Sequence, residues 1–370
     1  MRLYPPRNPL RRCGRKIPFS PIPRKPFRPR RDGLRRAGVR HARRYGRRPR
    51  HAKAGGKFGG TMRPICSIVM PTRDCLAYLP KAFASIRLQQ VEGLEILVVD
   101  DGSTDGTDAF LAGEAGHWPA LRVLSTDGIG PARARNHAIE RAEGELIAFL
   151  DADDVWLDHK LSRQLAYHAA NPEVALTGTD YRFVNEAGQT FSTFFDLVKP
   201  DEFFFGAPAF QRLADPCAAL LGCNLIGTST AVARTEVLRA VGGFPTDVPS
   251  ASDWALWLKI ADRHPVAISG ATLVDYLDRP GSVSKNIAAR IAALHAIVDA
   301  YADRTSPAMV KSVRRVRTQI ALVEAEADLA AGRTWASLVG RLRAFAGDPS
   351  PEIARGIAAS LLVGIGARSI

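Results

Sequence analysis

The sequence predicts an α/β protein with a mostly parallel sheet and helices on both faces. Short apolar runs, rich in β-branched residues, alternate along the chain with longer segments that have helical spacing. Each apolar run ends in a polar or glycine-containing turn, as strands of a parallel sheet do before their crossover helices. The 370 residues are 46% hydrophobic, which is enough to bury a sizeable core.

Four strands and four helices are expected between residues 66 and 169. The strands cover residues 66–70, 95–99, 121–124 and 146–150. Residues 71–72 (Pro-Thr) should end the first strand, because proline lacks the N–H that a strand donates. The helices cover residues 79–88, a segment from about 107 to 115, 131–142 and 158–169. Asp105 is placed to cap the second helix, and a proline stands at the start of the third.

Beyond about residue 175 the pattern is looser. We expect a strand at 225–233, a turn at 242–245 and a helix at 254–261. Residues 286–345 are alanine-rich with a stripe of Val316, Ile320 and Val323, which predicts packed helices. Residues 357–370 predict a further packed helix or a weak contact with a membrane surface. The chain therefore divides into residues 1–61, 62–285 and 286–370.

The net charge of +14 is concentrated at the N-terminus. Residues 1–60 hold 21 Lys and Arg and one acid, whereas the rest has 30 basic and 36 acidic residues. Residues 1–61 are also rich in proline and poor in aliphatics, so we expect a disordered basic segment. Met62 precedes the first strand and is a candidate for the true start; the alternative is a basic arm that binds nucleic acid or an anionic membrane. Because the remainder is mildly acidic, nucleic acid is not an expected partner of the body.

Cysteine content and hydropathy predict a cytoplasmic protein. The five cysteines form no Cys-x-x-Cys pair, and their odd number favours reduced, buried thiols. No run of 18 apolar residues and no signal-peptide core occurs, so no membrane span is expected. Contact with the inner face of a membrane would therefore be peripheral.

Polar clusters follow three of the predicted strands. They are residues 72–74 (Thr-Arg-Asp), 100–103 (Asp-Asp-Gly-Ser) and 151–154 (Asp-Ala-Asp-Asp). Parallel strands bring such ends together, and ligands bind there. The carboxylates of the third cluster repel one another, which a divalent cation would relieve. Mg²⁺ or Mn²⁺ uses one or two carboxylates and completes its shell with phosphate oxygens and water.

No phosphate-binding glycine loop follows the first strand. There is no Walker A motif, and Gly128-Ile129-Gly130 comes after the third strand without a third glycine. A metal held by carboxylates would then take the place of such a loop. This favours a nucleoside diphosphate over a dinucleotide as ligand.

Several segments between residues 65 and 285 resemble a known family in content and order. They are 67–72 (SIVMPT), 98–107 (VVDDGSTDGT), 134–139 (ARNHAI), 144–154 (GELIAFLDADD), 224–234, 242–244 (GGF) and 252–258 (SDWALWL). Together they are similar to family-two inverting glycosyltransferases. The resemblance implies the GT-A fold, a Rossmann-like, mostly parallel sheet with flanking helices, here followed by a C-terminal helical region.

The resemblance also implies a nucleotide-sugar site. Its residues would be Pro71, Thr72, Asp100, Asp101, Arg135, Asn136, Asp151 and Arg279. Either Asp100 or Asp101 would accept a hydrogen bond from the base, usually uracil, and the sequence does not separate the two. Asp153 would bind Mn²⁺ or Mg²⁺, Asp151 would contact the metal or the ribose, and Asp154 would lie behind them.

Asp253 resembles the catalytic base of this family. It would take the proton of an acceptor hydroxyl, which attacks the anomeric carbon as the nucleoside diphosphate leaves. Two positions differ from the family pattern. Ser252 stands where a glutamate is frequent, which removes a like charge and predicts a weaker base. Arg279 stands where many members have a metal-binding histidine, so it would hold the diphosphate as a fixed cation.

The sequence thus predicts a metal-dependent transfer of a sugar from a nucleoside-diphosphate sugar to a glycan or lipid-linked acceptor. By analogy we expect a role in surface polysaccharide, cell-wall or other glycoconjugate synthesis. Ser252 and Arg279 leave open a catalytically inactive relative, and the basic segment leaves open a scaffold. A nucleotidyltransferase is disfavoured, because no glycine-rich basic loop follows the first strand.

Overall fold

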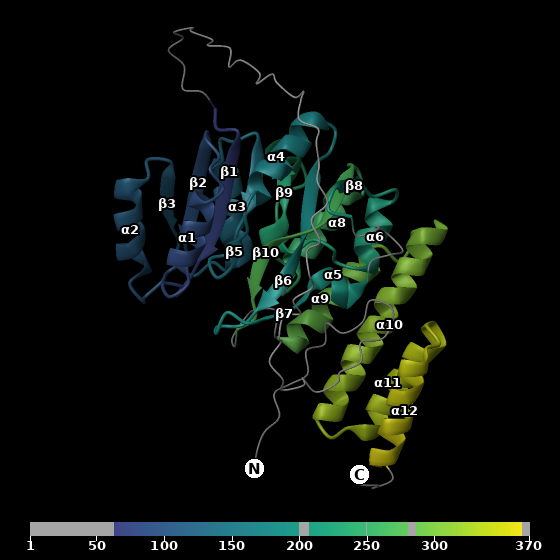
Figure 1. Ribbon diagram of the computed structural model, residues 1–370. Helices are drawn as coiled ribbons and strands as arrows, with labels where there is room; N and C mark the ends of the chain where they lie inside the picture. The colour runs from purple at the N-terminus through teal and green to yellow at the C-terminus, as the bar shows by residue number, and fades with distance from the viewer. Residues whose placement is uncertain (1–62, 200–206, 249, 280–285, 365–370) are drawn as a thin grey trace, which may run out of the picture. The chain divides into compact units, whose positions relative to one another are not determined.

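The structure, a computed structural model, describes residues 63–199, 207–248, 250–279 and 286–364. Within these ranges one sheet carries helices on both of its faces (Figure 1). The predictions for residues 1–61, Met62, Cys13 and residues 365–370 lie outside the described residues.

Ten strands pair into this sheet within the described residues. Eight of them follow the order β3-β2-β1-β4-β9-β6-β10-β5, while β7 pairs with β6 and β8 pairs with β10. The strands are β1 (Cys66–Thr72), β2 (Leu94–Asp100), β3 (Leu121–Ser125), β4 (Leu146–Phe149), β5 (Val155–Trp156), β6 (Leu176–Val184), β7 (Thr190–Thr193), β8 (Phe210–Arg212), β9 (Val232–Arg234) and β10 (Val266–Leu277).

The predicted parallel arrangement is confirmed for the main part of the sheet. The strands β3, β2, β1 and β4 are parallel, and so are β6 and β10. β9 runs antiparallel to both of its neighbours, β4 and β6, and joins these two parallel groups. The strands β5, β7 and β8 also pair antiparallel.

Two strand boundaries differ from the prediction. β1 continues through Pro71 to Thr72, because the Thr72 carbonyl still accepts a hydrogen bond of 2.9 Å from Asp101 N. The strand expected at 225–233 forms only at its end. A 3-10 turn, η1 (Thr228–Thr230), precedes β9, because Thr230 N and Thr230 Oγ1 both donate to the Gly227 carbonyl.

The helices predicted before residue 261 are confirmed to within a few residues at their ends. The helices are α1 (Leu79–Arg87), α2 (Thr107–His117), α3 (Pro131–Arg141), α4 (Lys160–Ala170), α5 (Phe194–Val198), α6 (Pro216–Gly222), α7 (Thr235–Ala240), α8 (Ser252–Ala261), α9 (Ile287–Ala300), α10 (Pro307–Ala330), α11 (Thr334–Gly347) and α12 (Pro351–Gly364).

The two faces of the sheet bury separate apolar layers. Successive side chains of a strand point to opposite faces, so Val69 packs with α3 and α8 residues while Ile68 and Met70 pack with α1 and α4 residues. The four described cysteines are buried and free, as expected. β1 therefore lies between two helical layers. Because β2 and β4 run parallel to β1, the carboxyl ends of these three strands lie at the same edge of the sheet.

The C-terminal helices pack on one another and on the first layer. α10 lies against α6, where Ser312 Oγ donates to the Ala218 carbonyl at 2.7 Å, and α11 and α12 follow (Figure 1). The predicted stripe of Val316, Ile320 and Val323 is buried. Among the described helices none combines the length and the apolar character needed to cross a bilayer.

Candidate active site

A cleft of about 1360 Å³ opens at the carboxyl ends of β1 and β4. η1, the start of α3 and the start of α8 contribute further walls. Most of the predicted site residues line it, namely Pro71, Thr72, Asp101, Arg135, Asp151, Asp153, Asp253 and Arg279. Asp100 and Asn136 are not among its lining residues. The cleft thus lies at the strand ends where the sequence analysis expects the ligand.

Asp101, rather than Asp100, faces the cleft. Asp100 accepts a hydrogen bond from Ser103 N at 3.2 Å within its own turn. Asp101 accepts hydrogen bonds from Ile129 N and Gly130 N, both at 2.7 Å, and from Thr126 Oγ1 at 2.6 Å. Burial raises the pKa of Asp101, but these hydrogen bonds outweigh burial and lower it overall. An ionised Asp101 therefore holds the loop before α3 against the end of β2.

Asn136 joins α3 to the loop after α7. Its Nδ2 donates to the Phe244 carbonyl at 2.8 Å, and Phe244 N donates to Oδ1 at 2.7 Å. Gly243 has φ of +67°, and a Cβ there would lie 2.4 Å from Asn136 Oδ1. The structure thus does not bring Asn136 to the predicted nucleotide contact; its amide is used in packing two elements.

Two arginines neutralise the acidic cluster that follows β4. The Arg135 guanidinium forms an ion pair with Asp151, and Arg279 Nε donates to Asp153 Oδ2 at 2.7 Å. The Arg279 guanidinium also lies over the Tyr78 ring, 5.2 Å from its centre. Burial and the charge of Asp151 raise the pKa of Asp153, against the opposing effect of Arg279.

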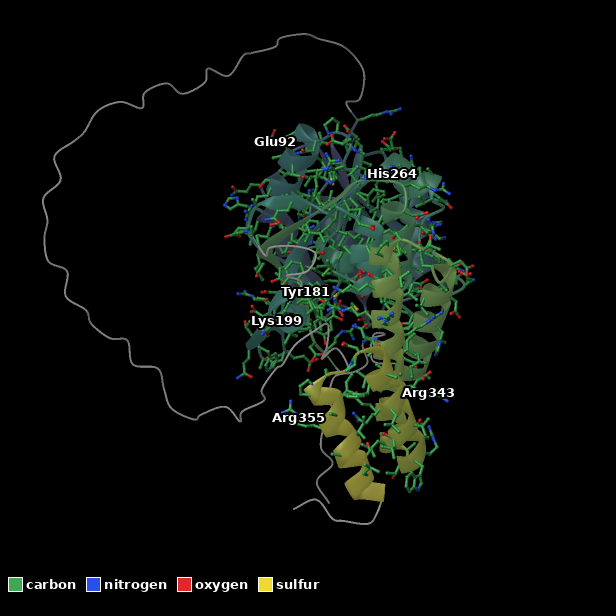
Figure 2. The ribbon with its side chains drawn as sticks, turned by 90° about the vertical axis from the view of Figure 1, so that its right-hand side faces the viewer. Glu92, Tyr181, Lys199, His264, Arg343 and Arg355 are labelled. Carbon is green, nitrogen blue, oxygen red and sulfur yellow. The ribbon has the colours of Figure 1, made fainter. Side chains whose placement is uncertain are left out.

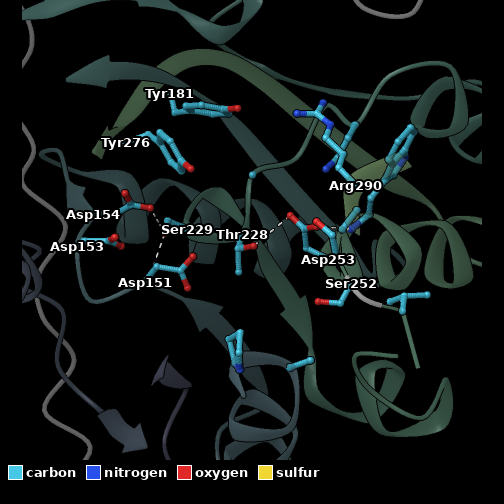
Figure 3. Close-up of a pocket in the computed structure, with 18 of the residues that line it drawn as sticks. Asp151, Asp153, Asp154, Tyr181, Thr228, Ser229, Ser252, Asp253, Tyr276 and Arg290 are labelled. Carbon is cyan, nitrogen blue, oxygen red and sulfur yellow. Dashed lines mark hydrogen bonds between the residues drawn. The ribbon is translucent and has the colours of Figure 1, made fainter. Parts of the chain in front are cut away.

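Asp154 lies behind these two carboxylates and is buried. It accepts hydrogen bonds from Ser229 Oγ at 2.5 Å and from Leu277 N at 3.1 Å. Burial, and then the charges of Asp153 and Asp151, raise its pKa well above the ordinary value. Ser229 Oγ also accepts a hydrogen bond from Asp151 N at 3.0 Å, so one hydroxyl ties the cluster to η1 (Figure 3). The sequence analysis missed Ser229, because its segment was interpreted as a plain strand.

The acidic cluster suits a divalent cation that arrives with a phosphate ligand. No group of three His, Cys, Asp or Glu side chains in the described ranges is arranged to hold a metal by itself. Asp151 and Asp153 supply the one or two carboxylates that Mg²⁺ or Mn²⁺ takes when phosphate and water complete its shell. Arg279 Nε holds Asp153 Oδ2, so a metal that uses this oxygen would displace the arginine from it.

Asp253 lies across the cleft from this cluster, in the first turn of α8 (Figure 3). Its Oδ1 accepts a hydrogen bond from Trp254 N at 2.7 Å, and its Oδ2 accepts one from Thr228 Oγ1 at 3.2 Å. Burial raises the pKa of Asp253 despite these hydrogen bonds and the charge of Arg135. Burial thus raises the pKa of Asp253 without a carboxylate at position 252, and the effect of Ser252 on the strength of the base stays a prediction.

Three further residues of the cleft carry no sequence motif. Tyr181 of β6 and Tyr276 of β10 have ring centres 5.5 Å apart, and Arg290 of α9 lies near them and near Asp253 (Figure 3). They come from the region in which the sequence pattern is loose. A lone tyrosine or arginine has no local signal that separates it from an ordinary surface residue.

The sequence of the chain is similar to that of known glycosyltransferases. Residues 67–227 match the family described as glycosyl transferase family 2. An Escherichia coli protein, UDP-Glc:alpha-D-GlcNAc-diphosphoundecaprenol beta-1,3-glucosyltransferase WfgD, is 31% identical over 60% of this chain and 80% of its own length. An uncharacterized glycosyltransferase of Rickettsia felis is 27% identical over 70% of this chain. The match spans only 41% of the length of the Rickettsia protein.

A solved structure agrees at the level of the fold. The crystal structure of residues 1–349 of S. aureus TarS superimposes with a TM-score of 0.54 and 17% sequence identity. The superposition covers 81% of this chain and 91% of the TarS chain. The strand-end residues of the cleft also occur in the same order along the chain as the family motifs. Together with these matches, they identify the chain as a member of glycosyltransferase family 2 with the GT-A fold.

Proposed function

We propose that the chain transfers a sugar from a nucleoside-diphosphate sugar to a hydroxyl of a glycan or lipid-linked acceptor, with inversion at the anomeric carbon. One observation carries this proposal. Asp253, a carboxylate with a raised pKa, faces the same cleft as the acidic cluster and its two arginines.

The donor nucleotide is assigned to the end of the cleft formed by β1, the Asp101 loop and the start of α3. Pro71 and Thr72 line that end, and Asp101 supplies a carboxylate beside it. Arg279 reaches from the other side, where it can leave Asp153 and pair with the diphosphate. A guanidinium suits this role, because it stays charged and donates two parallel hydrogen bonds.

Mn²⁺ or Mg²⁺ is the metal that the site would take. Asp153 would hold it, with Asp151 close by, and the ion would stabilise the negative charge that develops on the leaving diphosphate. Arg279 and Arg135 would contribute positive charge at the same place.

Asp253 acts as general base in this scheme. It accepts the proton of the acceptor hydroxyl. An electron pair of that oxygen then forms the bond to the anomeric carbon, from the face opposite the diphosphate. The bond between that carbon and the diphosphate oxygen breaks, and its electrons leave with the nucleoside diphosphate. A single displacement of this kind inverts the configuration. The Thr228 hydroxyl orients the carboxylate for this proton transfer.

The names of the relatives support a sugar acceptor linked to a lipid diphosphate. The E. coli relative is named for a GlcNAc-diphosphoundecaprenol acceptor, and a Bacillus subtilis relative is named for teichuronic acid biosynthesis. We infer a role in surface polysaccharide synthesis, with a peripheral contact at the inner face of the membrane.

Ligand-induced thermal stabilisation tests the donor site. UDP, GDP, CDP and dTDP are added one at a time, with and without Mn²⁺ or Mg²⁺, because binding to the native state raises the melting temperature. We expect a shift with one nucleotide that grows when metal is present. Absence of any shift would contradict the proposal and favour an inactive relative.

The base is tested by Asp253→Asn in the same protein. We expect the transfer rate to fall by about 10²–10⁴-fold, the usual contribution of a general base, with the nucleotide shift retained. Asp299→Asn, an exposed position on α9, is the control that removes one carboxylate elsewhere. A rate unchanged in Asp253→Asn would exclude this residue as the base.

A further inference from the structure

The C-terminal helices form one wall of the catalytic cleft. Arg290 and Leu294 of α9, Gln319 and Val323 of α10, Arg341 of α11 and Arg355 of α12 all line it. These helices follow the segment matched by the family, which ends at residue 227. This wall of the cleft is therefore built from residues that lie outside the segment matched by the family.

Arg290 is the charged residue of this wall that lies nearest to the reaction centre. It is half-buried and lies near Tyr181, Tyr276 and Asp253 (Figure 3). Its guanidinium forms no ion pair or side-chain hydrogen bond with another residue in the described part of the chain, whereas Arg135 and Arg279 each hold a carboxylate. Burial lowers the pKa of Arg290, against the favourable charges of the same three neighbours.

A half-buried guanidinium that lines a cleft can donate parallel hydrogen bonds to an anion delivered by the substrate. The donor diphosphate is assigned to the Arg279 side of the cleft, across from Asp253. The anion near Arg290 is then expected to belong to the acceptor.

We propose that Arg290 binds an anionic group of the acceptor, a phosphate or a carboxylate, near the hydroxyl that Asp253 deprotonates. The proposal rests on the proposed transferase function and adds the charge of the acceptor to it. The tyrosine pair beside Arg290 offers an aromatic surface for the acceptor sugar ring.

The rest of this wall carries charges of both signs. Arg341 and Arg355 line the same cleft farther along the C-terminal helices, as does Glu326 of α10, and Arg341 Nε is buried without a hydrogen-bond partner among the described residues. In Figure 2, Arg355 lies on one side of these helices and Arg343 on the other. Arg343 is exposed and is not a lining residue of the cleft. It therefore serves as a matched control.

The test measures sugar binding to the full chain saturated with UDP and Mg²⁺, so that the donor site is filled. Three probes are titrated by calorimetry: α-GlcNAc 1-phosphate, methyl α-glucuronide and the neutral methyl α-GlcNAc. We expect at least one anionic probe to bind about tenfold or more tightly than the neutral glycoside, as charge-assisted hydrogen bonds provide. The better anionic probe identifies the anion as phosphate or carboxylate.

In Arg290→Gln this preference should disappear, in Arg290→Lys it should return in part, and in Arg343→Gln it should be unchanged. Equal binding of charged and neutral probes by the unaltered chain would overturn the proposal, and so would an anion preference that survives Arg290→Gln. UDP binding is recorded in every variant. If the unaltered chain does not bind UDP, the proposed donor site is refuted instead. In that case the same probes, titrated without UDP, still test Arg290.

Discussion

Two arginine side chains determine the charge of the donor end of the cleft. Asp151 and Asp153 stand next to each other in space, and each has one guanidinium partner, Arg135 and Arg279 respectively. Arg135 is buried and projects from the first half of α3, whereas Arg279 is a quarter exposed and follows the end of β10. Arg279 is therefore the partner that can exchange a carboxylate for a phosphate at low cost.

Replacement of Arg279 by alanine separates its two effects. We expect kcat to fall by about 10–100-fold, because one charge-assisted contact to the leaving diphosphate is lost. The Mn²⁺ concentration for half-maximal activity should fall as well, because Asp153 no longer has a competing cation. Steady-state kinetics with varied Mn²⁺ measure both quantities. Arg212→Ala, which breaks a surface pair with Glu173, is the control. Unchanged turnover in Arg279→Ala would contradict the role.

The buried side chain of Lys160 should make the free energy of unfolding depend on pH. The side chain is fully buried, its Nζ lies 4.1 Å from the centre of the Trp156 ring, and it has no hydrogen-bond partner among the described residues. Burial lowers its pKa from 10.5 to about 7. Between these values the unfolded chain binds a proton that the folded chain does not, so stability should rise with pH across this window.

Lys160→Met should remove this part of the pH dependence. Near pH 7 and below, we expect the variant to be more stable by roughly 1–3 kcal/mol, the usual cost of an unsatisfied buried polar group. Urea unfolding at several pH values between 6.5 and 9 measures the difference. Lys259→Met, at an exposed position of α8, should leave the pH dependence as it is. A Lys160→Met curve parallel to that of the unaltered chain would refute the assignment.

At the scale of elements, the contact between α3 and the loop after α7 holds the wall of the cleft that is proposed to bind the nucleotide. Asn136 makes two hydrogen bonds to the Phe244 backbone, and Phe244 packs against Phe149 with ring centres 5.3 Å apart. α3 also carries Arg135, which reaches Asp151. A change in this loop should therefore affect both stability and the donor site.

Two adjacent glycines test this contact. Gly242 and Gly243 both have positive φ, +81° and +67°, but an added Cβ meets nothing within 4 Å at Gly242 and meets Asn136 Oδ1 at 2.4 Å at Gly243. Gly242→Ala should cost about 1–2 kcal/mol from left-handed backbone strain alone. Gly243→Ala should cost more, because the Asn136 hydrogen bonds are also disturbed. Chemical unfolding compares the two variants, and equal losses would show that the Asn136 contact does not matter.

At the scale of the whole molecule, charge and catalysis are separated along the sequence. The segment 1–60 carries 21 basic residues and one acid, while the remaining chain has an excess of six acids. Every residue described in the cleft lies beyond position 70. From its charge alone, we propose that the basic segment attracts the protein to an anionic surface.

Removal of residues 1–61 tests this separation. We expect the shortened chain to keep its transfer rate within about twofold and to lose salt-sensitive binding to anionic lipid vesicles. Vesicle sedimentation at low and high salt measures the binding, and initial rates measure the transfer. A large loss of transfer rate would instead indicate that the basic segment takes part in the reaction.

The parts of the fold found from sequence are those with a local signal. The strands β1 to β4 and the helices α1 to α4 were predicted, since each has its own apolar periodicity and turn residues. β6 and β10 were missed. β6 contains buried Thr177, Thr179 and Asp180, and β10 is interrupted by register shifts near Thr272. Such strands look polar or irregular until their neighbours supply hydrogen bonds.

By itself, the sequence determined the α/β class and the strand-end carboxylates, because these depend on residue type at a short spacing, while Asp253 and Arg279 were expected from the resemblance to family-two glycosyltransferases. Only the tertiary structure decided that Asp101 rather than Asp100 faces the cleft and that Asn136 does not. It also decided that Arg279 pairs with Asp153, 126 positions away, and that Arg290 stands near Asp253. These outcomes depend on packing between distant segments, which no local pattern of residues encodes.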